Sequence, residues 1–222
     1  MRIGTWNLDA KWSPAHRDLL RRQRCDVWLL TEVTQQVASP KEGVAGYNAH
    51  LSSCVMSRGQ HWAAVLSLAP IKPLPDSHQA SAAVVVDDIT YCSTVLPWAG
   101  CSKHLPCPWK GETLEEMVAP TLEALSTKLP RSKTVWGGDW NQNLEGGWEY
   151  VGSKGMRSHL NLAITQLGLQ VPTAKLFHQL GPGHHSIDHI AVPSNWKVTK
   201  AVTAAALGLS DHDACFVEVE PC

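Results

Sequence analysis

Gly137-Gly138-Asp139-Trp140-Asn141 and Ser210-Asp211-His212-Asp213 are the two stretches that decide how this chain is interpreted. Each comes after a run that predicts a buried strand, Lys133 to Trp136 before the first and Ala201 to Leu209 before the second. Carboxylates, amides and imidazoles at strand ends are costly to bury, because ionised groups resist desolvation. Their presence therefore indicates a polar site of the kind that a metal-assisted hydrolase needs.

The 222 residues have the size and composition of one domain. Residues 1–222 contain no linker, repeat or low-complexity run, and the 44% hydrophobic content can fill a substantial core. Met1 to Thr5 lead straight into a strand-like pattern, and no apolar run could span a bilayer, so we expect a soluble, cytoplasmic protein without a membrane partner. We also expect a monomer. Seven cysteines, an odd number scattered through apolar strands, indicate reduced thiols.

The charge of the chain gives no support to a nucleic-acid partner, and it does not exclude one. Its 19 basic and 20 acidic residues give a net charge of −1, whereas nucleic-acid binders usually carry a basic excess or a basic face. One basic cluster exists, and we interpret it as the solvated face of a helix: Arg17, Arg21, Arg22 and Arg24.

Hydrophobic periodicity and capping signals predict about nine strands and three helices. The strands are expected at residues 2–8, 26–30, 62–68, 82–86, 90–96, 133–136, 187–192, 198–205 and 215–219, and the helices at 13–24, 113–129 and 156–167. Pro120 lies inside the second helix and predicts a kink or a break. Because the strands do not alternate strictly with helices, we expect an α/β (α+β) fold with two stacked mixed β-sheets flanked by helices.

Polar residues recur at the ends of these apolar strands. Taken singly, each has an ordinary explanation as a strand-end cap, a surface residue or a turn former. Taken together, several unrelated strands deliver residue types suited to phosphoryl chemistry. The residues are Asn7, Glu32, Asp139, Asn141, Asp188, Asp211 and His212.

The motifs around these residues resemble those of the endonuclease/exonuclease/phosphatase superfamily, which includes deoxyribonuclease I, exonuclease III and the inositol polyphosphate 5-phosphatases. The resemblance extends from residue 3 to residue 219, and it implies a four-layer α/β sandwich and metal-dependent phosphoester hydrolysis. Five motifs carry it, in chain order: Thr5-Trp6-Asn7, Leu30-Thr31-Glu32, Gly138-Asp139-Trp140-Asn141, Ile187-Asp188-His189-Ile190 and Ser210-Asp211-His212.

The resemblance implies a magnesium site, with manganese as a possible substitute. Glu32 would be a ligand, since a hard cation prefers carboxylate oxygen. Asp211 and Asn7 would complete or support the site. The ion would polarise a phosphoryl oxygen of a nucleic acid or of a small phosphoester.

The resemblance also implies catalytic roles for four residues. His212 would accept a proton from water or, when protonated, stabilise the phosphate. Asp188 would hold its imidazole in the working tautomer. Asp139 would orient or deprotonate the water, and Asn141 would donate a hydrogen bond to the pentacovalent phosphorus centre. Whether His212 or Asp139 is the general base stays open.

One segment departs from the family pattern. Many members that act on nucleic acid carry Tyr or His on the strand before a Pro-Asn pair, but here the segment is Ser93-Thr94-Val95-Leu96-Pro97-Trp98. Trp98 stands where Asn is common, and it could stack on a base or pack at the rim of the site. His61 or His104 could supply the missing contact, and His185 could touch a phosphate.

The segment from Cys101 to Cys107 allows a second interpretation. Cys101, His104 and Cys107 could bind zinc together with Cys92, although the spacing is unlike the common paired-cysteine patterns. A polar loop with incidental thiols, or a local disulfide in an oxidising compartment, is the alternative. A role in substrate recognition is favoured over zinc.

The sequence therefore favours a magnesium-dependent phosphoester hydrolase, with a phosphodiesterase or nuclease as the first interpretation. The near-zero charge and the altered segment leave room for a phosphatase acting on a small phosphorylated metabolite or an inositol phosphate. A catalytically inactive binding module of the same fold is the third alternative, and the complete set of polar residues opposes it.

Overall fold

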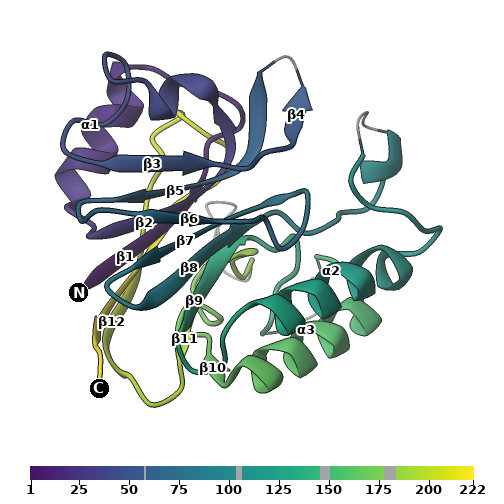
Figure 1. The fold of residues 1–222 in the computed structure, drawn as a ribbon. Helices are drawn as coiled ribbons and strands as arrows, with labels where there is room; N and C mark the ends of the chain where they lie inside the picture. Colours follow the sequence, from purple (N-terminus) through teal and green to yellow (C-terminus); the bar gives the residue numbers. More distant parts are fainter. Residues whose placement is uncertain (58, 104–106, 146–150, 178–183) are drawn as a thin grey trace.

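The computed structural model describes residues 1–57, 59–103, 107–145, 151–177 and 184–222. Two mixed β-sheets stack face to face, with helix α1 (Pro14–Gln23) outside one sheet and helices α2 (Leu114–Lys128) and α3 (Lys154–Leu167) outside the other (Figure 1). These are the four layers expected of an α/β sandwich.

The first sheet has seven strands in the described residues. Its order is β12 (Lys197–Ala204), β13 (Ala214–Glu220), β1 (Arg2–Asn7), β2 (Val27–Thr34), β5 (Gln60–Ser67) and β3 (Asn48–Leu51), and β4 (Val55–Ser57) also pairs with β5. β1 and β2 are parallel, and the other pairs are antiparallel.

The second sheet has six strands in the described residues. Its order is β10 (Leu169–Gln170), β11 (Asp188–Pro193), β9 (Thr134–Asp139), β8 (Ile89–Thr94), β7 (Ser81–Val86) and β6 (Lys72–Leu74). Only β8 and β9 are parallel among these pairs. The two sheets are thus both mixed, as the sequence predicted.

Three apolar clusters fill the spaces between the four layers. The cluster between the sheets includes Leu29, Val65 and Ile190, all fully buried. A second cluster joins α1 to the first sheet, and a third joins α2 and α3 to the second sheet. Each sheet is therefore covered on both faces, and an ionised group within it would be costly to bury.

The helices begin and end where the sequence predicted. Thr113 and Glu116 form the expected capping box of α2, and Gly168 ends α3 in the left-handed conformation, with φ 69°. Of the two outcomes expected at Pro120, the break is wrong, since α2 continues through it, and the kink stays a prediction. Pro120 lies on the exposed side of the helix, where water can solvate the carbonyl that loses its partner.

Two other sequence expectations need correction. The run from Ala201 to Leu209 is not a buried strand before Ser210: β12 ends at Ala204 and is half-buried or exposed throughout. The reason is that β12 lies at the edge of its sheet. Four short strands, β3, β4, β6 and β10, were not predicted, because two to four residues give too little periodicity to detect.

The seven cysteines are all free, and Cys25, Cys92 and Cys215 are buried as expected. The zinc alternative at Cys101, His104 and Cys107, which the sequence disfavoured, is not tested by the described residues, where the one group of three or more possible ligands is Asp139, Asp188 and His212. His104 lies outside the described residues. No helix in the described ranges is both long and apolar enough to cross a bilayer.

Candidate active site

Two buried carboxylates face each other across neighbouring strands of the second sheet. Asp139 ends β9, Asp188 begins β11, and the antiparallel register pairs them directly. Their exposed fractions are 2% and 0%. Gly138 has φ 125°, and a Cβ there would lie 2.2 Å from the carbonyl oxygen of Thr94. Only glycine therefore allows β8 to approach closely enough to fix the end of β9.

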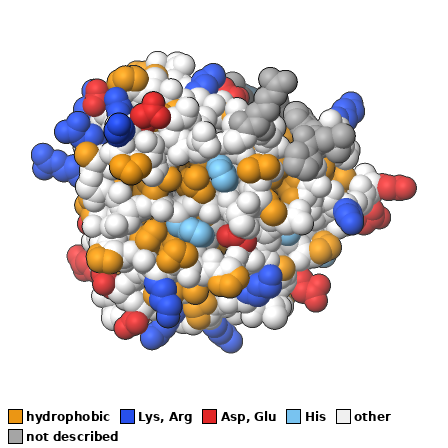
Figure 2. All heavy atoms as spheres, turned by 45° about the horizontal axis from the view of Figure 1, so that its top comes forward, with side chains coloured by type: hydrophobic (Ala, Val, Ile, Leu, Met, Phe, Trp, Pro, Cys, Tyr) orange, Lys and Arg blue, Asp and Glu red, His pale blue; other side chains and the backbone are white. Residues whose placement is uncertain are grey.

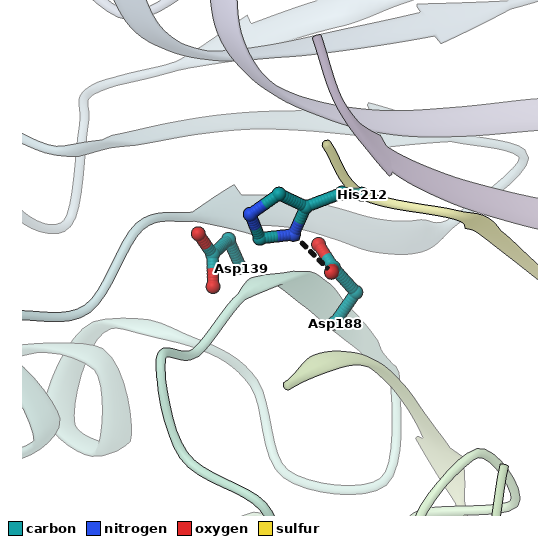
Figure 3. A group of neighbouring side chains, drawn as sticks. All are labelled: Asp139, Asp188 and His212. Carbon is teal, nitrogen blue, oxygen red and sulfur yellow. Dashed lines mark hydrogen bonds and ion pairs between the residues drawn. The ribbon is translucent and has the colours of Figure 1, made fainter. Parts of the chain in front are cut away.

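His212 reaches this pair from the connection between β12 and β13. Its Nδ1 lies 2.6 Å from Asp188 Oδ2, and Figure 3 shows the imidazole lying between the two carboxylates. The indole of Trp6 donates to the carbonyl of His212 at 2.9 Å, and Ser210 Oγ accepts from its backbone N–H at 3.0 Å. The imidazole is thus held both at its backbone and at its ring.

The pKa values of both His212 and Asp139 are raised above their ordinary values. Burial would lower the pKa of His212, but the charge and hydrogen bond of Asp188, with Asp139 and Asp211, outweigh it and raise the pKa to about 10. Burial is also the main reason that the pKa of Asp139 rises to about 7. Without a metal ion, the site therefore holds an imidazolium at neutral pH.

Asn7 links the two sheets at the site. Its Nδ2 donates to Glu32 Oε1 and to Asp139 Oδ2, both at 3.0 Å, and its Oδ1 accepts from the N–H of Asp9 at 2.9 Å. Glu32 lies within β2 at φ 48°, a conformation that costs free energy in a residue other than glycine. Burial raises the pKa of Glu32, while the amide of Asn7 lowers it. Asn7 thus holds carboxylates of both sheets with one amide group.

Asn141 and Asp211 lie at the edge of this cluster. Asn141 has φ 50°, its N–H donates to Asp139 Oδ1 at 2.9 Å, and its Nδ2 donates to the carbonyl of Leu96 at 2.9 Å. Asp211 is exposed over 71% of its side chain, with Oδ1 3.9 Å from His212 Nε2. The structure therefore brings together all seven predicted catalytic and metal residues.

The predicted substrate contacts are more scattered. Trp98 packs against Trp62 and Trp109, with ring centroids 6.4 Å and 5.7 Å away. His61 lies in β5 opposite Val33, the residue after Glu32, and its Nδ1 lies 2.7 Å from the carbonyl oxygen of Ser52. His185 stacks on Phe177 at 5.1 Å. The fourth, His104, lies outside the described residues, so its placement is not tested.

The sequence reasoning missed the roles of three residues at the site. Asp9 and Lys11 form an ion pair in the turn after β1, and Asp9 raises the pKa of Glu32 through its charge. Asp9 follows Asn7 by two residues, which was the available signal. The structural role of Ser210 was also missed. Its hydroxyl donates to the carbonyl of Asn7 at 2.7 Å and so links the segment that carries His212 to the end of β1.

Comparison with known proteins finds the same architecture in several solved structures. No protein-family model and no curated protein sequence matches the chain. An AP endonuclease from Archaeoglobus fulgidus superimposes with a TM-score of 0.72 at 16% identity, over 98% of each chain. A 3' phosphatase from Neisseria, solved with a product DNA hairpin, gives 0.69 at 18% identity over 99% of each chain.

An endonuclease/exonuclease/phosphatase protein from Beutenbergia cavernae gives a TM-score of 0.72 at 16% identity, over 100% of this chain and 71% of that one. The chain has the endonuclease/exonuclease/phosphatase fold. In this endonuclease/exonuclease/phosphatase fold, both sheets contribute to the cluster: β1 and β2 carry Asn7 and Glu32, and β9 and β11 carry Asp139 and Asp188.

The side chains of the cluster fit a divalent cation. Ligand atoms of Asp139, Asp188 and His212 lie within 4.8 Å of one another. Among the described residues, Asp188 Oδ1 is buried and has no hydrogen-bond partner, which is unusual for a carboxylate oxygen. The donors are mostly carboxylate oxygens, and these suit magnesium or manganese better than zinc.

Proposed function

We propose that this protein is a magnesium-dependent phosphoester hydrolase, with manganese as a substitute, that cleaves phosphodiester bonds of nucleic acid. One observation carries the proposal: the imidazole of His212 is held 2.6 Å from buried Asp188 and beside a second buried carboxylate, Asp139. Such a constellation is costly for folding, and a hydrolytic site is the function that requires these groups together.

The proposed ligands of the metal are Glu32 and Asp211, with Asn7 in support, beside the group of Asp139, Asp188 and His212 whose ligand atoms lie within 4.8 Å of one another. Bound magnesium supplies charge neutralisation at the phosphoryl oxygens. Asn7 already uses its NH₂ group for two carboxylates and its oxygen for a backbone N–H. Its proposed role is therefore to hold Glu32 and Asp139 in place.

The chain's own groups would then manage the water and the phosphate. Asp188 fixes the imidazole of His212 through Nδ1, and the ring's Nε2 lies 3.9 Å from Asp211 Oδ1. The pairing with Asp188 supports a charged His212 that stabilises the phosphate, and in this proposal Asp139 accepts the proton from water. Asn141 donates one amide N–H to Leu96, and an amide carries a second N–H that could reach the phosphorus centre.

Nucleic acid is the first choice of substrate because two similar structures are an AP endonuclease and a 3' phosphatase bound to DNA. A small phosphorylated metabolite or an inositol phosphate is the second candidate, and the net charge of −1 supports it. On the face drawn in Figure 2, Lys and Arg lie mainly at the rim, around a band of apolar, histidine and acidic side chains, so this face shows no broad basic surface. An inactive binding module is opposed by the convergence of the polar residues.

Hydrolysis assays test the proposal. Purified protein would be assayed with magnesium, with manganese and with excess chelator on single- and double-stranded DNA, RNA, a phosphodiester, a phosphomonoester and inositol phosphates. We expect metal-dependent diester cleavage, reduced about 10²- to 10⁴-fold in His212→Ala. His159→Ala, on α3 away from the site, is the matched control and should retain activity.

The alternative outcomes are distinct. Cleavage of monoesters alone would assign the protein to the phosphatase candidate. Turnover on no substrate, by a folded protein, would contradict the enzyme proposal and favour the binding module.

A further inference from the structure

The turn after β1 places a lysine among the acidic groups of the site. Lys11 Nζ pairs with Asp9 Oδ2, and it also experiences the charge of Asp211. Asp9 and Asp211 in turn both act on Glu32 through their charges. We call Asp9, Glu32 and Asp211 the acidic mouth. Among the described residues, two basic side chains are recorded in ion pairs with this group: Lys11 with Asp9, and His212, whose Nε2 lies 3.9 Å from Asp211 Oδ1.

This turn is held in place at a conformational cost. Asp9 and Ala10 have φ of 50° and 51°, and alanine in this left-handed region costs about 1 kcal/mol or more. Three hydrogen bonds fix the turn: Lys11 N–H to Leu8 O at 2.9 Å, Ala10 N–H to Glu32 O at 2.9 Å, and Asp9 N–H to Asn7 Oδ1 at 2.9 Å.

The second and third of these bonds attach the turn directly to Glu32 within β2 and to Asn7 at the end of β1. The strained backbone therefore fixes where Asp9 and Lys11 emerge relative to the carboxylates. A solvated surface lysine would need no such attachment, and an exposed ion pair alone contributes little to stability. The arrangement is better explained by an effect of Lys11 on what the acidic mouth binds.

An ammonium and a divalent ion respond to the same negative field. Bringing a divalent ion toward carboxylates that already hold an ammonium adds repulsion between like charges, and Lys11 must be neutralised or displaced. The lysine stem is long and flexible, and its side chain is 55% exposed, so displacement into water is open to it.

We propose that Lys11 is a resident counter-cation of the acidic mouth, which keeps the metal-free site electrostatically balanced and sets its affinity for a divalent ion. The inference rests on the proposed metal dependence and adds to it a residue that regulates metal occupancy. Lys11 is a positioning and tuning residue in this proposal, since it acts through the carboxylates.

Direct metal binding tests the proposal without an activity assay. Free Mn²⁺ would be titrated into metal-free protein and followed by electron paramagnetic resonance at low ionic strength. Lys11→Met removes the charge but keeps an unbranched stem, and we expect it to bind Mn²⁺ about 3- to 10-fold more tightly. Lys11→Arg keeps the charge and should bind as the wild type does.

Lys197→Met is the matched control, because it also breaks an exposed lysine–carboxylate pair, with Glu220 at 2.9 Å. That pair lies at the other end of β12, seven residues and roughly 23 Å of strand from the site end. Its Mn²⁺ affinity should be unchanged. In 0.3 M KCl the difference between Lys11→Met and wild type should shrink, since salt screens exposed charges.

The outcomes separate this inference from the proposed function. If wild type binds Mn²⁺ and Lys11→Met binds it equally or more weakly, the counter-cation role is overturned while metal dependence stands. If neither protein binds Mn²⁺, both proposals fail. Circular dichroism of each variant checks folding, and Lys11→Gln provides a second neutral variant on which the same expectation must hold.

Discussion

The pairing of His212 with Asp188 makes a strong prediction about protonation. Asp188→Asn keeps the shape of the side chain but removes its charge at the atom 2.6 Å from His212 Nδ1. A pKa raised from 6.5 to about 10 corresponds to roughly 5 kcal/mol of preference for the imidazolium. Burial alone would lower this pKa, and Asp188 is the largest contribution that raises it. We therefore expect the His212 pKa to fall by at least about two pH units in the variant.

The same shift predicts a pH dependence of stability. His212 has a higher pKa when folded than when unfolded, so its stabilising contribution is fully present below about pH 6.5 and is lost as the pH rises toward 10. The metal-free wild type should lose up to roughly 5 kcal/mol of this contribution between those limits. In Asp188→Asn the free energy of unfolding should change much less over the same range.

Two measurements in the presence of chelator check this prediction. Nuclear magnetic resonance titration of the His212 ring gives its pKa directly, and urea unfolding at pH 6 and pH 9 gives the stability difference. Asp211→Asn is the control, because it removes the same charge from a side chain that is 71% exposed and contributes least among the carboxylates named as acting on His212. A His212 pKa in Asp188→Asn that stays near the wild-type value would refute the reasoning.

Three further predictions concern the framework of the site. Gly138→Ala should destabilise the protein by about 2 kcal/mol or more in urea, because φ is 125° and the new Cβ would meet Thr94 O at 2.2 Å; a loss below about 0.5 kcal/mol would contradict this. Burial lowers the pKa of His189 to about 4, so its stability contribution is present above about pH 6.5 and falls as the pH drops toward 4, by up to roughly 3 kcal/mol. His189→Gln should therefore show a shallower loss of stability between pH 7 and pH 5 than the wild type, and an unchanged slope would count against it. Asn7→Ala should raise the pKa of Glu32 further, measured by carbon-detected titration in chelator, since the Asn7 amide lowers it; a pKa that stays the same or falls would exclude that role.

Much of the fold follows from local patterns in the chain. The capping box at Thr113 and Glu116, the hairpin turn at Asp87 and Asp88, and the stop at Gly168 each depend on residues within a few positions of one another. Four short strands, β3, β4, β6 and β10, were not predicted from the sequence, because each is short and forms only by pairing with a neighbouring strand.

The sequence by itself determined which polar residues follow or border the apolar strands. The order of the motifs was enough to predict that five of them belong to the site: Asn7, Glu32, Asp139, Asp188 and His212. A side chain's chemistry and its place along a strand are local properties, so they can be read from the chain.

Only the tertiary structure decided how these groups act on one another. The register that sets Asp139 opposite Asp188 and the amide of Asn7 that spans both sheets depend on distances between segments far apart in the chain. The pairing of Lys11 with Asp9 depends on a backbone turn that propensity disfavours. Electrostatic coupling and desolvation vary with these distances and with burial, and neither quantity exists until the sheets have packed.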